Sequence, residues 1–136
     1  MADLVFTKAD QVQVVQQFTG PAVEAITEGQ RCRFDATTGY IALGNGTTAA
    51  EIAPGGIATH AAAIGEALTI INQGIVDVGN IAAWAALNYG DPIYVSDTDG
   101  AFGGAAGDST VDTIVGRVIP GWDTTAGEKL LWLNGL

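Results

Sequence analysis

The chain contains one cysteine, Cys32, and one histidine, His60, the two side chains best suited to nucleophilic or acid–base chemistry. A catalytic pair needs an exposed thiolate beside a base. Cys32 lies in the alternating run Gln30-Arg31-Cys32-Arg33-Phe34, so we expect Cys32 and Phe34 to be buried and both arginines to face water. His60 lies in a predicted strand of small residues, where it faces solvent or a partner subunit. Because no cluster of zinc ligands surrounds either residue in the sequence, we predict that the chain is not an enzyme.

Three further patterns could belong to cofactor or ion sites. Asp97-Thr98-Asp99-Gly100 has the start of a calcium loop, but the residues that follow do not supply the remaining ligands, which favours a hairpin turn with Asx-type hydrogen bonds. Gly44-Asn45-Gly46 and Gly103-Gly104 lack the Lys-Ser/Thr pair and following helix of a phosphate loop. Neither Lys8 nor Lys129 lies at a hairpin tip, where a lipoyl or biotinyl carrier has its modified lysine. We therefore predict no metal and no cofactor.

The elements that position these residues read as short strands. Nineteen glycines separate apolar and β-branched runs of about strand length (~5–6 residues). Thr37-Thr38-Gly39 predicts a hairpin turn between two of them. The sequence predicts strands at residues 12–15, 30–34, 40–43, 57–64, 68–72, 75–78, 93–96, 114–119 and 129–133.

One segment, residues 80–88, follows a different pattern. It is rich in alanine and opens with Asn80, a good N-cap residue. Ile81, Trp84 and Leu87 recur at helical spacing, which predicts one short α-helix.

An internal similarity relates the two halves of the chain. Glycine opens and closes both residues 29–39 and residues 90–100, and the proposed inward residues correspond as Cys32 with Ile93 and Phe34 with Val95. Residues 65–72 match residues 127–134 in the same way, with Leu68 over Leu130 and Ile70 over Trp132, which places Trp132 in the core. Two such half-units side by side can close a barrel. Chance similarity between glycine-rich hairpins is the alternative.

Composition limits the classes of partner. The 136 residues are 48% hydrophobic and only 15% charged, which suggests that part of the apolar surface contacts other subunits. The net charge of −10 disfavours nucleic acid and anionic membrane surfaces. The opening Met1-Ala2-Asp3-Leu4 has no signal-peptide pattern, and no apolar run reaches the ~20 residues of a membrane helix, so we expect synthesis in the cytoplasm.

The segment Gly90-Asp91-Pro92-Ile93-Tyr94-Val95-Ser96-Asp97 is similar to the "G-D-x-V-Y-x-D" element of small tailed-phage capsid decoration (cement) proteins. The preceding alanine-rich segment and the later strands, 114–118 and 130–133, keep that family's order. Residues 34–64 resemble the β-rich body of lambdoid head-decoration proteins. The resemblance extends from near Glu28 to the end of the sequence.

The resemblance implies an all-β fold, a small β-barrel or β-tulip of two similar half-units with one short helix near 80–88 and an extended N-terminal arm. It implies residues 1–20 as the arm, or as a first strand, and 21–136 as a single barrel domain. It also implies a virion protein on the outer capsid surface that bridges subunits of the major capsid protein. Self-association as a homotrimer at three-fold and quasi-three-fold positions is part of this expectation.

Contact residues follow from the same resemblance. The candidates for capsid contact lie in the opening segment and are Leu4, Val5, Phe6, Val12 and Val14. Trp84, Trp122 and His60 are the candidates for the trimer interface, with core packing as the alternative for Trp84. Two other functions stay open: a different minor virion component, such as a head-fibre or tail-associated protein, and a small ligand-binding β-barrel.

Overall fold

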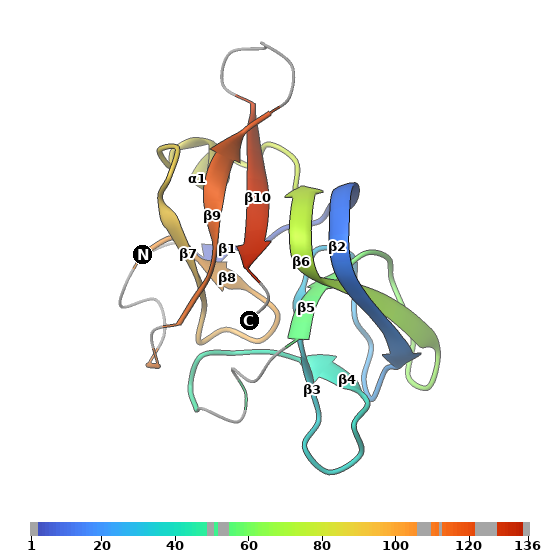
Figure 1. Ribbon diagram of the computed structural model, residues 1–136. Coiled ribbons are helices and arrows are strands. Elements are labelled where there is room, and N and C mark those ends of the chain that lie inside the picture. Colours follow the sequence, from blue (N-terminus) through green and yellow to red (C-terminus); the bar gives the residue numbers. More distant parts are fainter. Residues whose placement is uncertain are drawn as a thin grey trace.

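The computed structural model describes residues 3–48, 51, 55–105, 110–111, 113–121 and 128–134. These residues form an all-β fold with one short helix, which confirms the predicted all-β class (Figure 1). The elements are β1 (Asp3–Leu4), β2 (Asp10–Pro21), β3 (Arg31–Phe34), β4 (Ile41–Leu43), β5 (Gly55–Ala58), β6 (Ala67–Asp77), α1 (Ala82–Ala85), β7 (Pro92–Val95), β8 (Phe102–Gly103), β9 (Ile114–Pro120) and β10 (Lys129–Asn134).

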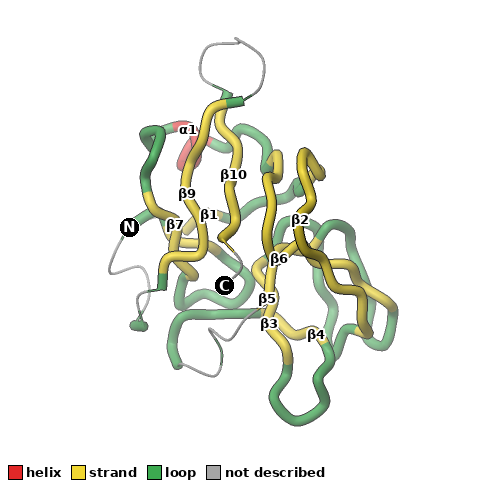
Figure 2. Tube along the Cα trace, in the orientation of Figure 1, coloured by secondary structure: helices red, strands yellow, loops and turns green. Residues whose placement is uncertain are grey.

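All the strands belong to one ten-stranded sheet that curls into a half-barrel (Figures 1 and 2). The order is β1-β8-β7-β9-β10-β6-β5-β3-β4, and β2 pairs with β6 off this path. Every strand pair is antiparallel. Hairpins and short connections between antiparallel strands need no crossover helices, which agrees with the low helix content.

The strand order is the same in the two halves of the chain. Residues 31–77 contribute the order β4-β3-β5-β6, and residues 92–134 contribute β8-β7-β9-β10. In the ladders Cys32 lies opposite Gly56, and Ile93 lies opposite Gly116.

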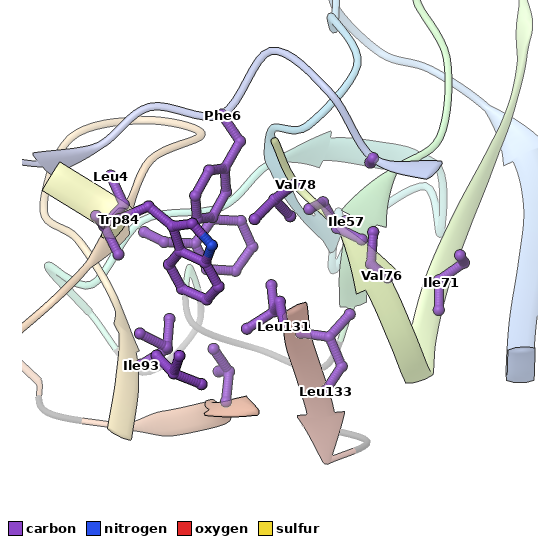
Figure 3. Close-up of a cluster of buried hydrophobic side chains, with 14 of the residues drawn as sticks. Leu4, Phe6, Ile57, Ile71, Val76, Val78, Trp84, Ile93, Leu131 and Leu133 are labelled. Atoms are coloured by element: carbon purple, nitrogen blue, oxygen red, sulfur yellow. The ribbon is translucent and has the colours of Figure 1, made fainter. Parts of the chain in front are cut away.

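Two clusters of buried side chains form the core. The larger one surrounds Trp84, whose ring meets Phe6 edge-on with 5.3 Å between centroids (Figure 3). The Trp84 indole N–H donates to the Lys129 carbonyl oxygen at 3.2 Å, so its polar atom is satisfied. The smaller cluster contains Ile26, Cys32, Ile41, Ala58, Leu68 and Ile70. The predicted burial of Cys32 is confirmed.

Several predicted boundaries are wrong. The strand expected over 57–64 ends at Ala58, and the runs 68–72 and 75–78 belong to one continuous strand, β6. The helix covers Ala82–Ala85 rather than 80–88; its N-cap is Ile81 and no side chain caps it. A short helix without a cap has little stability of its own, so the packing of Trp84 into the core must hold it.

Arg31 does not face water as predicted. It is only 2% exposed, and its Nη1 donates to the carbonyl oxygens of Cys32, at 2.9 Å, and Gly56, at 3.4 Å. Desolvation lowers the pKa of Arg31 to about 10. Phe34 is half-buried rather than fully buried, and it packs edge-on against Phe18 at 4.9 Å. Alternation separates the two faces of a strand but does not say that one of them meets water. Here the Arg31 side of β3 is also covered by the chain, with the Arg31 side chain packed beside Gly44.

The opening of the sequence forms strands of the sheet. β1 pairs with β8, and β2 pairs with β6 along its length, from Asp10 opposite Asp77 to Pro21 opposite Ala67. The side chains of Asp3 and Ser96 join the first strand to the β7–β8 turn, with 2.5 Å between oxygens. Residues 3–21 are therefore not a free arm in this structure.

Candidate protein-interaction surface

The most exposed long element is β2. Its residues from Asp10 to Thr19 are all exposed, and it pairs with β6 alone among the described strands. Figure 1 shows it as the outermost of four strands, β9, β10, β6 and β2, that lie side by side. A strand in this position presents unpaired backbone N–H and C=O groups, which can hydrogen-bond to an added strand.

The side chains of β2 also favour the addition of another strand at this edge. Four of them are large, apolar and exposed: Val12, Val14, Val15, which is 63% exposed, and Phe18, which is 43% exposed. Edge strands are usually protected by charges or proline. In β2 a charge occurs only at Asp10, where Lys8 Nζ lies 3.4 Å from a carboxylate oxygen, and proline occurs only at Pro21. The remaining feature that could hinder pairing with another strand is the irregular register of the β2–β6 ladder, which shifts between residues 11 and 13, 14 and 16, and 16 and 17 of β2.

The predicted capsid-contact residues are divided by the structure. Val12 and Val14 are exposed on β2, and Val5 is exposed directly after β1. Leu4 and Phe6 are 1% and 2% exposed and belong to the Trp84 cluster. These two side chains are covered by the chain's own core, so in this conformation they are not available to a partner. Their hydrophobicity indicates that they are buried, but the sequence does not show whether a partner or the chain's own core covers them.

Of the predicted trimer-interface residues, the structure describes Trp84 and His60, and it does not place these two on one surface. Trp84 is fully buried, as the core-packing alternative for it expected. His60 is exposed in the bend after β5, where its Nε2 accepts the Thr69 amide N–H at 3.1 Å. Trp122 lies outside the described residues.

Trp132, expected in the core, is instead 54% exposed on β10. In the β9–β10 ladder Trp132 lies opposite Arg117, the residue after Gly116. In the corresponding β5–β6 ladder Ile71 lies opposite Ile57, the residue after Gly56. The aligned partner of Trp132 is thus Ile71 and not Ile70. This shift does not by itself explain the exposure of Trp132, because Ile70 and Ile71 are both 0% exposed. The two strands differ in what covers them: β6 is buried at both positions, whereas the Trp132 face of β10 is open to solvent.

Sequence reasoning also missed Val15 and Phe18 as exposed residues. The available signal was a long uncharged β-rich run, Gln11 to Thr19, with apolar residues at both odd and even positions. Such a run cannot place all its apolar groups on one buried face. It therefore favours a strand with exposed apolar groups.

The residues with potential chemistry are engaged inside the chain. Burial raises the pKa of the Cys32 thiol to about 12, which suppresses the thiolate at neutral pH. Asp97 accepts hydrogen bonds from the amide and hydroxyl of Thr110, both at 2.7 Å, and Asp99 accepts one from Asn45 Nδ2 at 2.6 Å. The predicted turn is present, with the Ala101 amide N–H donating to the Thr98 carbonyl oxygen at 3.1 Å, but the two carboxylates accept these bonds from distant residues rather than in the predicted Asx-type pattern. Within the described residues, no group of three or more His, Cys, Asp or Glu side chains is placed to hold a metal ion.

No helix of the described chain has the length and apolar character needed to cross a membrane. No protein-family model, curated protein or solved structure matches this chain.

Proposed function

We propose that this chain is a virion structural protein, a capsid decoration (cement) protein that binds the outer surface of a phage head and bridges subunits of the major capsid protein. The resemblance of residues 90–97 to the decoration proteins gives the class of protein. The observation that supports binding is β2, twelve residues long, exposed, and free of charge between Asp10 and Pro21.

The proposed contact is strand addition. An extended segment of the capsid protein pairs with the outer edge of β2, and Val12, Val14, Val15 and Phe18 pack against its side chains. Backbone hydrogen bonds then supply affinity and the apolar groups supply specificity. The net charge of −10 does not hinder a protein that works outside the DNA-filled shell. Homotrimers at three-fold positions remain part of the proposal through the resemblance alone.

We also propose that the chain arose from two similar half-units, residues 29–77 and 90–134. The equal strand orders support this, and so do matched glycine conformations. Gly29 and Gly90 have φ values of 90° and 88°, and Gly39 and Gly100 have values of 74° and 76°. Only glycine adopts this region readily, so the same residue is required at both copies of each turn.

Co-sedimentation with expanded heads that lack this protein tests the proposal. Wild-type protein is expected to saturate near one copy per capsid subunit. Val15→Glu and Phe18→Glu put a charge on the edge and are expected to weaken binding by about tenfold or more. Tyr40→Glu, at an exposed site beside the 37–39 turn, is the matched control and is expected to bind normally.

Three results would contradict the proposal or the contact assigned to β2. Binding of only a handful of copies per head would indicate another minor virion component, and absence of binding would favour a ligand-binding barrel. Equal binding by the β2 variants and the Tyr40 control would show that the edge of β2 is not the surface that contacts the capsid.

A further inference from the structure

A second surface lies on the open face of the sheet, away from the edge of β2. Directly paired residues share one face, and the ladders run from Gln13 to Ile75, from Ile75 to Trp132, and from Trp132 to Arg117. This row therefore crosses β2, β6, β10 and β9, the four strands that lie side by side in Figure 1. The exposed indole of Trp132 stands in the middle of it.

The centre of the row is hollowed. Gly116, Arg117, Trp132 and Asn134 line a depression of about 190 Å³. Pockets for drug-sized ligands have volumes of ~300–1,000 Å³, so this one suits a single ring of a ligand that stays largely in solvent. The Trp132 side chain is 54% exposed. Gly116 contributes only backbone to the hollow, because a Cβ there would point to the buried face of the sheet, toward Leu131.

The polar groups around the indole are held in place. Arg117 Nη1 donates to the Gly90 carbonyl oxygen at 3.0 Å, and Asn134 Nδ2 donates to the Ile114 carbonyl oxygen at 3.1 Å. Exposed amides of Gln73 and Gln13 lie on the same face, since Gln73 is paired with Asn134. Amides offer both donors and acceptors, and the guanidinium offers further donors.

A flat apolar ring surrounded by planar hydrogen-bonding groups matches a sugar. One face of a hexose ring consists of C–H groups that pack on an aromatic ring, while its rim carries hydroxyls that both donate and accept. An anionic sugar would meet the field of a chain with net charge −10 and a single arginine in the hollow. We propose that the Trp132 hollow binds one ring of a neutral saccharide chain. None of the residues that line the hollow belongs to β2, so this site is distinct from the proposed capsid contact, and only Gln13 borders both.

A screen against soluble neutral oligosaccharides of glucose, galactose, mannose and N-acetylglucosamine, with acidic oligosaccharides beside them, tests the proposal. At least one neutral oligosaccharide is expected to bind and to change the tryptophan fluorescence. Trp132→Ala is expected to weaken that binding by about tenfold or more, and Arg117→Ala by less. Tyr40→Ala removes another exposed aromatic residue and is expected to leave it unchanged. Urea unfolding checks that the variants remain folded, which the exposure of Trp132 favours.

The proposal is overturned if no neutral oligosaccharide binds wild-type protein above the Trp132→Ala background, or if acidic sugars bind best. Head binding is measured in parallel with the same variants. Trp132→Ala protein that binds heads normally but not sugar would support two independent surfaces. Loss of head binding by Trp132→Ala, with no sugar binding by wild type, would assign Trp132 to a protein contact instead.

Discussion

At the scale of single residues, glycines decide where strands can approach one another. A Cβ on Gly56 would press on the carbonyl oxygen of Ile71, and one on Gly116 would press on that of Trp132. Both obstacles are backbone atoms of the adjacent strand, which cannot move without opening the ladder. Gly39 differs, because nothing lies within 4 Å of its missing Cβ and only its φ of +74° requires glycine.

This contrast predicts unequal costs for the same substitution. Gly56→Ala and Gly116→Ala are each expected to lower the free energy of unfolding by about 2–3 kcal/mol, since overpacking displaces a strand. Gly39→Ala is expected to cost about 1–2 kcal/mol from its left-handed backbone alone. Urea denaturation measures all three. A cost at Gly39 equal to or larger than that at Gly56 would contradict the close strand approach.

Asp3 carries a pH dependence at the same scale. Hydrogen bonds from Ser96 and then Thr98 favour its charged form and lower its pKa below the ordinary value of 3.8. A carboxyl whose pKa is lower in the folded state stabilises the fold above its unfolded pKa and loses this effect as pH falls through the folded pKa. Asp3→Ala is therefore expected to be less stable than wild type at about pH 7, with the difference vanishing near about pH 2. A constant difference across this range, measured by urea unfolding, would contradict this linkage.

At the scale of elements, two apolar side chains of the segment from β1 to Phe6, Leu4 and Phe6, pack into the chain's own core rather than against a partner. β1 contributes only two ladder positions, opposite Phe102 and Gly103, so side chains must hold the segment. Phe6 does so by packing against both Trp84, at 5.3 Å, and Phe102, at 5.4 Å.

Substitutions at neighbouring positions separate the two roles of this segment. Phe6→Ala is expected to lower the free energy of unfolding by about 3–5 kcal/mol, because it leaves a cavity beside Trp84. Val5→Ala, at the adjacent exposed position, is expected to change it by less than about 0.5 kcal/mol. Chemical denaturation followed by tryptophan fluorescence gives both values. Equal, small effects would show that the segment is a free arm in solution.

At the scale of the whole molecule, the net negative charge affects the stability of the fold. Fifteen acidic and five basic residues give the chain a net charge of −10, and Arg31, one of the five, is buried. Self-repulsion of this kind opposes a compact fold, and salt screens it over a Debye length of about 10 Å at 0.1 M. The midpoint of thermal unfolding is therefore expected to rise between about 0.01 M and about 0.2 M sodium chloride. A midpoint that falls over this range would mean that attractive charge pairs outweigh the repulsion.

The sequence by itself determined the all-β class, most strand positions, the 37–39 turn and the burial of Cys32. These depend on local patterns, namely glycine spacing, β-branched runs and turn residues, which act within a few neighbours along the chain. Only the tertiary structure decided that Leu4 and Phe6 enter the core, that Arg31 is buried and that Trp132 faces solvent. Each of these depends on which strands become neighbours and in what register. A one-residue shift in pairing reverses the faces of a strand without changing its sequence.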